Sequence, residues 1–158
     1  MILIVDNYDS FTYNLYQLVG RFTNNIEVLK NDDVLLKNIK LRSKDKIVFS
    51  PGPGRPVNAG MMNEIINKYK KNVPMLGICL GHQAIAEVFN GSIIKSPEIC
   101  HGKVRSIEHN LDCQIFKGIP KVFKATRYHS LIVNDNDLST TFRITAKTVR
   151  ENLIMGIE

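Results

Sequence analysis

One cysteine of the 158-residue chain lies in a context that suits a nucleophile. Cys79 has Gly77 and Gly81 two residues to either side, and an apolar run precedes this GxCxG pattern. In a nucleophile elbow, a sharp turn between a strand and a helix, such glycines avoid collisions while the central side chain stays exposed above the sheet. We expect the dipole of the following helix to favour the Cys79 thiolate, and the Leu80 backbone N–H to stabilise an oxyanion. The alternative is that Cys79 is a small buried hydrophobe, as free cysteines usually are.

Proline and glycine alternate in a second loop, residues 51–54 (PGPG), directly after an apolar run. The carboxyl ends of neighbouring parallel strands meet at one edge of an open α/β sheet, where ligands bind. Two prolines restrain the backbone, and two glycines allow a substrate to approach closely. The pattern predicts that the Gly54 N–H is a second oxyanion donor, facing Leu80. The alternative is an ordinary turn.

Strand and helix patterns alternate in the first part of the chain and would position these two loops. Apolar, β-branched runs predict strands at 2–5, 26–29, 46–49 and 73–78. Helices are expected from Ser10, which can cap a helix, and over 59–71 and 81–89. The first helix has its apolar residues on one stripe: Phe11, Leu15, Leu18, Val19 and Phe22.

The second part of the chain has a different texture, with short β-like pieces broken by turns. These pieces, at 93–94, 104–107, 142–145 and 154–157, are expected to be added or antiparallel strands. The whole pattern predicts an α/β fold, an open and mostly parallel sheet with helices on both faces and short added β-strands. No linker or internal repeat marks a second domain, so we expect a single domain over residues 1–158.

The composition excludes several classes of protein. The net charge of +6 comes from scattered lysines, and the one tight cluster, Lys68, Lys70 and Lys71, is explained by a solvated helix face, so we expect no nucleic-acid partner. Three cysteines without CxxC spacing predict neither a disulfide framework nor a metal site. The amino-terminal apolar run is too short to span a membrane and has no signal-peptide flanks, so we expect a soluble protein that is not secreted.

Five collinear motifs together resemble the triad-type, or class I, glutamine amidotransferases. The resemblance covers essentially the whole chain and is closest to the small subunits of anthranilate synthase and of its para-aminobenzoate-pathway twin, aminodeoxychorismate synthase. The amino-terminal motif separates these subunits from the amidotransferases of guanosine monophosphate synthetase and carbamoyl-phosphate synthetase. The motifs are residues 6–14 (DNYDSFTYN), 50–54 (SPGPG), 77–83 (GICLGHQ), 101–103 (HGK) and 127–131 (RYHSL).

The resemblance implies a flavodoxin-like class I fold and glutamine hydrolysis through a covalent intermediate. Cys79 would attack the side-chain amide of L-glutamine and form a thioester, while the backbone N–H groups of Gly54 and Leu80 hold the oxyanion. No metal or organic cofactor is implied for this subunit, since magnesium would belong to the chorismate-binding partner. The implied glutamine pocket consists of Gly52, Pro53, Gly54, Gln83, Ser130 and Leu131.

The resemblance also implies a partner, a large chorismate-binding subunit called component I. This partner would use the released ammonia to aminate chorismate and eliminate pyruvate, giving anthranilate for tryptophan biosynthesis. An aminodeoxychorismate partner in the folate pathway remains an alternative, as does a different cysteine hydrolase on the same fold. A codon bias towards Lys, Asn and Ile indicates the cytoplasm of a bacterium, or a plastid stroma if the protein is organelle-encoded.

One family feature is missing from the sequence. The family places its general base in a His-x-Glu segment, expected shortly after residues 154–157, but the chain ends at Glu158 and contains no His-x-Glu. The sequence is therefore expected to be C-terminally truncated, or to be a glutaminase-deficient subunit that only binds its partner. In other triad enzymes the loss of one member costs several powers of ten in rate, so we expect little glutaminase activity from these residues alone. The histidines that remain as weaker candidates for the base are His82, His101, His109 and His129.

Overall fold

The computed structural model describes residues 1–98 and 100–158. The chain divides into two compact units, Met1–Val88 and Phe89–Glu158, and each is described by itself. The expectation of a single domain stays a prediction. Within the described residues, no helix is long and apolar enough to cross a membrane.

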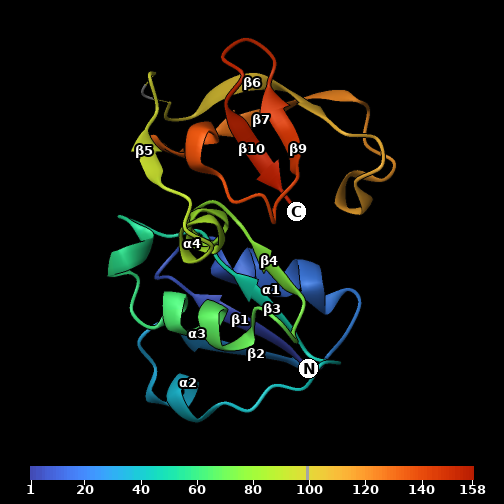
Figure 1. Cartoon of the computed structure of the whole chain (residues 1–158). Helices are drawn as coiled ribbons and strands as arrows, with labels where there is room; N and C mark the ends of the chain where they lie inside the picture. The colour runs from blue at the N-terminus through green and yellow to red at the C-terminus, as the bar shows by residue number, and fades with distance from the viewer. Residues whose placement is uncertain (99) are drawn as a thin grey trace. The chain divides into compact units, whose positions relative to one another are not determined.

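A four-stranded parallel sheet forms the centre of the first unit (Figure 1). Its strands are β1 (Ile2–Asp6), β2 (Ile26–Lys30), β3 (Lys46–Phe49) and β4 (Met75–Gly77), in the order β2-β1-β3-β4. The interior strand β1 is the most apolar, and Leu3, Ile4 and Val5 are completely buried. A strand covered on both faces needs such a continuous apolar run. The predicted parallel α/β fold is confirmed.

Four helices accompany this sheet: α1 (Thr12–Gly20), α2 (Val34–Asn38), α3 (Met62–Tyr69) and α4 (Leu80–Val88). Figure 1 shows α1 behind the sheet and α3 in front of it. The apolar positions of α3, Met62, Ile65 and Ile66, are buried against the sheet and α4. A 3₁₀ helix, η1 (Pro56–Asn58), lies between β3 and α3. Both faces of the sheet are therefore covered, as the alternation of patterns predicted.

The start of α1 differs from the expectation. Phe11, and not Ser10, occupies the N-cap position, and it makes no side-chain cap. Instead, the Asp9 carboxylate accepts a hydrogen bond from the Phe11 N–H at 2.8 Å, and the Thr12 hydroxyl donates to Asp6 at 2.7 Å. Aspartate suits this position because its side chain readily bonds the backbone two residues on.

The apolar stripe of α1 is only partly covered, with Leu15 and Val19 half-buried. Phe11, Leu18 and Phe22 are 63%, 55% and 89% exposed, whereas the fully buried residue of the helix is Thr12. Periodicity indicates that one side of a helix is apolar, but it does not show that another element covers that side. The core of the first unit is formed from the sheet, α2, α3 and α4 instead.

Antiparallel strands dominate the second unit, as predicted. A four-stranded sheet has the order β10-β9-β6-β7, and β5 pairs with β8 in a two-stranded sheet. The predicted piece at 142–145 begins two residues late, at Ile144, and β7 and β8 were not predicted. The strands are β5 (Ile93–Lys95), β6 (Lys103–His109), β7 (Val122–Arg127), β8 (Leu131–Val133), β9 (Ile144–Thr148) and β10 (Ile154–Ile157), with 3₁₀ helices η2 (Gln114–Phe116) and η3 (Asp135–Asp137).

Candidate active site

Cys79 lies in a sharp turn between β4 and α4. Its backbone has φ +54°, in the left-handed region that residues other than glycine rarely adopt. The Ile78 N–H donates to the Phe49 carbonyl at 3.0 Å, and the Gly81 N–H donates to the Ile78 carbonyl at 3.0 Å, so the turn is tied to β3 and closed on itself. The predicted strand–turn–helix geometry of the elbow is confirmed, while the catalytic role of Cys79 stays a prediction.

Both glycines of the GxCxG pattern are required by close packing. A Cβ on Gly77 would lie 2.4 Å from the backbone C and O of Gly81. A Cβ on Gly81 would lie 2.5 Å from Cβ and 2.6 Å from the carbonyl O of Phe49. These distances are far shorter than van der Waals contact, so any larger residue would force the turn away from β3.

The electrostatics of Cys79 differ from the expectation of a favoured thiolate. Burial raises the pKa of the thiol above its ordinary value, and the nearby Asp9 carboxylate raises the pKa further. The Leu80 backbone N–H, which points to the sulfur, acts in the opposite direction. Desolvation outweighs this donor because it disfavours the charged form. The thiol therefore keeps its proton unless another group removes it.

The loop that follows β3 lies against the elbow. A Cβ on Gly52 would meet Asn7 Cβ at 2.6 Å and Leu80 Cδ2 at 2.9 Å, so only glycine fits there. Gly54 has φ +78°, and a Cβ on it would meet nothing within 4 Å. The Gly54 backbone is consequently open to solvent on that side. The loop is therefore closely packed at Gly52, and its backbone is accessible at Gly54.

A hollow of about 400 Å³ opens beside this loop. It lies at the carboxyl ends of β1, β2 and β3, where the strand order reverses around β1. Ligand crevices in open α/β sheets occur at such switch points. Its lining residues are Asn7, Tyr8, Asn31, Asp32, Pro53, Asn58, Ala59, Gly60 and Leu80.

The first unit brings six of the eight predicted site residues to this edge. Gly52, Pro53 and Gly54 come from the loop after β3, and Cys79, Leu80 and Gln83 from the elbow and α4. The Gln83 N–H donates to the Cys79 carbonyl at 3.0 Å, and Gln83 is only 4% exposed. The other two, Ser130 and Leu131, lie in the second unit at the start of β8, where the Ser130 carbonyl accepts from the Ser96 N–H at 2.8 Å.

The histidines of the second unit have partners of their own. His109 is buried, and both ring nitrogens contact backbone carbonyls: Nδ1 lies 3.0 Å from the Asn110 oxygen, and Nε2 lies 3.0 Å from the Pro120 oxygen. His129 Nδ1 lies 2.8 Å from the Leu131 carbonyl, and burial lowers the pKa of His129 below its ordinary value. His101 contacts Tyr128 edge-on. In the first unit, His82 lies on α4, one turn after Cys79.

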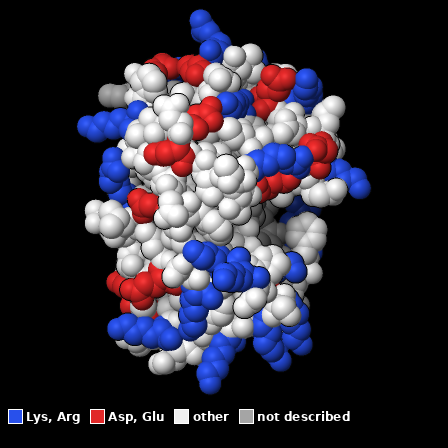
Figure 2. Space-filling view, viewed as in Figure 1, with Lys and Arg blue, Asp and Glu red and all other residues white. Residues whose placement is uncertain are grey.

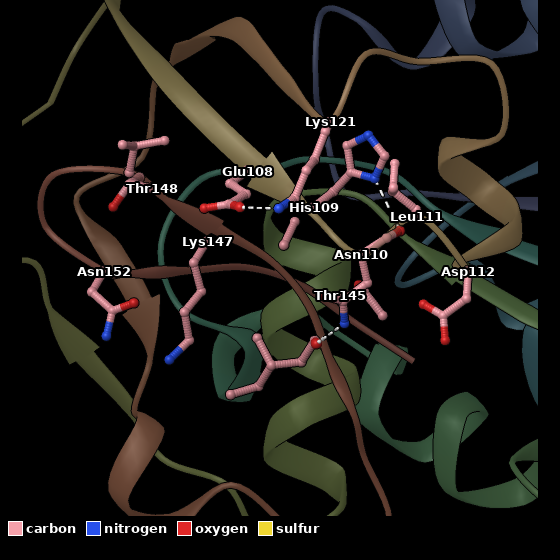
Figure 3. A pocket seen from close by; sticks show the side chains of 13 residues that line it. Glu108, His109, Asn110, Leu111, Asp112, Lys121, Thr145, Lys147, Thr148 and Asn152 are labelled. Atoms are coloured by element: carbon pink, nitrogen blue, oxygen red, sulfur yellow. Dashed lines mark hydrogen bonds and ion pairs between the residues drawn. The ribbon is translucent and has the colours of Figure 1, made fainter.

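A second hollow, of about 780 Å³, lies in the second unit (Figure 3). Its charged side chains are already paired: Lys121 with Glu108 at 2.9 Å, Lys147 with Asp135 at 2.7 Å, and Asp112 with Arg143. Nothing in the sequence marked this hollow, and no cysteine or serine lines it. Among residues 1–98 and 100–158, no three His, Cys, Asp or Glu side chains gather as a metal site. Catalytic chemistry is better supported at the elbow.

Comparison with known proteins identifies the family of the chain. The family description "Glutamine amidotransferase class-I" matches residues 3–158. The chain is 46% identical over 156 residues to the anthranilate synthase component 2 of Pyropia yezoensis, an alignment that covers 99% of this chain and 82% of that protein. It is 44% identical over 157 residues to the aminodeoxychorismate/anthranilate synthase component 2 of Bacillus subtilis, covering 99% of this chain and 80% of that protein.

Solved structures show a similar arrangement of elements. A glutamine amidotransferase from Thermotoga maritima matches with a TM-score of 0.74 at 17% identity, covering 99% of this chain and 70% of that chain. At this level of identity the likeness shows the fold alone. The sequence matches, which are much closer and run over nearly the whole chain, show the family.

Proposed function

Because the chain belongs to the class I glutamine amidotransferases, we propose that it is the glutaminase subunit of a chorismate-using synthase. The observation that carries the proposal is the left-handed backbone of Cys79 at the elbow, beside a glycine loop with open backbone. The partner is component I, the chorismate-binding subunit, as the names of both relatives suggest. The product of the complex is anthranilate, in tryptophan biosynthesis.

The chemistry follows from these groups. The Cys79 sulfur attacks the side-chain amide carbon of L-glutamine, and the negative oxygen of the tetrahedral intermediate accepts hydrogen bonds from the N–H groups of Gly54 and Leu80. Collapse of the intermediate breaks the C–N bond and releases ammonia, which leaves a γ-glutamyl thioester. Water then attacks the thioester and frees glutamate and the Cys79 thiol. Gly52, Pro53 and Gln83 complete the proposed glutamine pocket in the first unit, and Ser130 and Leu131 of the second unit stay predicted pocket residues.

This reaction needs a proton acceptor, because burial raises the pKa of Cys79. The 158 residues contain no His-x-Glu, and both ring nitrogens of His109 contact carbonyls. A polypeptide of these residues alone is therefore expected to have little glutaminase activity. The second candidate function is a glutaminase-deficient module that binds component I and supports only its reaction with free ammonia.

The folate-pathway product is the alternative within the first function. The name of the Bacillus subtilis relative covers both aminodeoxychorismate and anthranilate synthesis. Supplying this chain with each type of component I, and measuring which complex uses glutamine, would decide between the two pathways. No cofactor is proposed for this subunit, and its proposed compartment is the bacterial cytoplasm or the plastid stroma.

The test is a comparison of glutamine-dependent and ammonia-dependent anthranilate formation in the complex with component I. Cys79→Ala should abolish the glutamine-dependent rate and leave the ammonia-dependent rate unchanged, since only the former needs the nucleophile. Cys113→Ala, at a buried cysteine of the second unit, is the matched control and should change neither rate. Glutamine-dependent turnover that persists in Cys79→Ala would exclude this mechanism. A wild-type chain that supports only the ammonia reaction would favour the binding module.

A further inference from the structure

Three buried polar residues meet where β1, β2 and β3 of the first unit end. Asn7 follows β1, Asn31 follows β2, and Ser50 follows β3. They are 2%, 6% and 0% exposed. Buried polar groups persist only where their hydrogen bonds are made, so the contacts among these three residues indicate what the cluster holds in place.

Asn7 uses three of its groups inside the cluster. Its backbone N–H donates to Ser50 Oγ at 2.8 Å, and its side-chain Nδ2 donates to the Ser50 carbonyl at 2.9 Å. Its Oδ1 accepts from Asn31 Nδ2 at 3.0 Å. The Ser50 hydroxyl in turn donates to the Pro51 carbonyl at 2.6 Å. The cluster is thus bonded directly to the first residues of the loop that contains Gly54.

The other end of the same segment is bonded to Asn31. The Met61 N–H donates to the Asn31 carbonyl at 2.7 Å, and a Cβ on Gly60 would lie 2.5 Å from that oxygen. The Asn31 N–H donates to the Asp6 carbonyl at 2.9 Å. Segment 51–60 is therefore held at its entrance by Asn7 and at its exit by Asn31, and the two asparagines are bonded to each other.

We propose that Asn7 is a positioning residue that fixes the Gly54 N–H for oxyanion binding, with Asn31 as its support. Gly54 itself has open space around it, so its orientation depends on how the segment is held at its ends. Asn7 does so by hydrogen bonds to Ser50 and by packing of its Cβ against Gly52. The catalytic part of this inference rests on the proposed glutaminase function, whereas the positioning part does not.

The variant that tests this role is Asn7→Ala. It keeps the Cβ that packs on Gly52 but removes the bonds to the Ser50 carbonyl and to Asn31. Thr12→Val is the matched control, because it also removes one buried hydrogen bond after β1, to Asp6, without touching segment 51–60. Asn31→Ala is a second variant, which removes the Nδ2 hydrogen bond that supports Asn7 and keeps the backbone carbonyl that holds Met61.

The first measurement needs no turnover. Amide hydrogen exchange at Ala59 and Met61, whose N–H groups donate to the Pro56 and Asn31 carbonyls, is followed by NMR. It should become at least about tenfold faster in Asn7→Ala and in Asn31→Ala, and should stay unchanged in Thr12→Val. Equal exchange in all four proteins would overturn the proposal. Because this readout is independent of glutamine, it remains decisive even if the proposed function fails.

The second measurement is glutamine-dependent product formation in the complex with component I. Asn7→Ala should lower kcat by about 10- to 100-fold with KM for glutamine within about twofold, because a displaced donor weakens transition-state binding more than substrate binding. The ammonia-dependent rate and the Thr12→Val protein should be unaffected. A parallel fall of both rates, or an equal fall in Thr12→Val, would mean that Asn7 only supports folding. If the wild type turns over no glutamine, as expected without the His-x-Glu segment, the exchange measurement alone decides the positioning role.

Discussion

At the scale of single residues, Cys79 combines two opposing features. Its positive φ places it in the sharp turn of the elbow, whereas burial of the thiol raises its pKa. A buried thiolate is costly, so the resting side chain is protonated at neutral pH. The reactivity of this cysteine must then come from a base that acts when glutamine is bound.

The pH dependence of Cys79 alkylation follows from this raised pKa. Thiolate forms only at higher pH in the folded chain, so the iodoacetamide rate should reach its midpoint at a higher pH than in the urea-unfolded chain. Peptide mass spectrometry would follow Cys79 separately from Cys100 and Cys113, which are 0% and 1% exposed and should react far more slowly. A folded-state midpoint below the unfolded one would show that the helix dipole prevails over burial.

Gly81→Ala should damage the elbow without removing any reactive group. The new Cβ would press on Phe49 at 2.5 Å, and overpacking of this kind costs about 1–3 kcal/mol of unfolding free energy. The control is Gly20→Ala on α1, where the nearest atom to a new Cβ is 3.9 Å away; there alanine should be neutral or stabilise by about 0.5–1 kcal/mol. Urea unfolding measures both, and equal effects would refute the packing argument.

At the scale of elements, the sequence predicted strands and helices that have an apolar run or a periodic apolar pattern, whereas the short, buried β8 was missed. β1, β3 and α4 were found because long apolar runs or periodic patterns identify them. The five-residue α2 was missed because it is too short for a periodic pattern. β7 was missed because its residues are mostly exposed or half-buried, so tertiary pairing with β6, rather than composition, makes it a strand.

The candidate site was predictable to a similar extent. Glycine spacing at 52–54 and 77–81 indicated both loops, since turns with such close approach exclude other residues. The Asn7–Asn31–Ser50 cluster was not predicted, because single asparagines after strands are common in turns and nothing in the sequence shows that they face one another. Hydrogen-bond partners far apart in sequence become apparent only when the strands are in register.

An ion cluster ties β6 to the turn before β10. Arg105 pairs with Glu98 at 2.6 Å and with Glu151 at 3.2 Å, and Lys103 pairs with Glu98 at 2.9 Å. Arg105, followed by Lys103, lowers the pKa of Glu98 to about 2. Because the folded-state pKa is depressed, the stabilisation is complete above the ordinary carboxyl pKa and is lost as the pH falls towards about 2.

NMR titration of the Glu98 side-chain carboxyl carbon tests this cluster. The wild-type midpoint is expected at about pH 2, and Arg105→Gln should move it up towards the ordinary value of 4.5. Arg143→Gln is the control, since Arg143 pairs with Asp112 and Glu158 instead. An unchanged Glu98 midpoint in Arg105→Gln would show that the ion pair does not persist in solution.

At the scale of the whole molecule, the surface combines dispersed charge with an exposed apolar helix. The net charge of +6 is divided equally between the two units, and Figure 2 shows Lys and Arg side chains among Asp and Glu side chains on the viewed face. Leu18 on α1 is 55% exposed, and Phe22, two residues after the helix ends, is 89% exposed. Exposed apolar groups of this kind favour association in water.

Phe22→Ser should separate association from stability. The phenyl ring contributes little to the core, so the free energy of unfolding should change by less than about 0.5 kcal/mol, while self-association measured by sedimentation should decrease. Leu36→Ala, at a completely buried position of α2, is the contrast and should cost about 2–5 kcal/mol. A large loss of stability in Phe22→Ser would mean that another part of the chain covers this ring.

The central place of β1 in its sheet affects how the protein is made. β1 is synthesised before its neighbours, yet β2 ends at Lys30 and β3 at Phe49, so the ribosome must add more than forty residues before both edges of β1 are paired. During that time at least one edge of the apolar run Leu3, Ile4 and Val5 has no partner strand and can pair with other nascent chains. Extra chaperone during synthesis is therefore expected to raise the yield of correctly folded protein in cells by protecting this one segment.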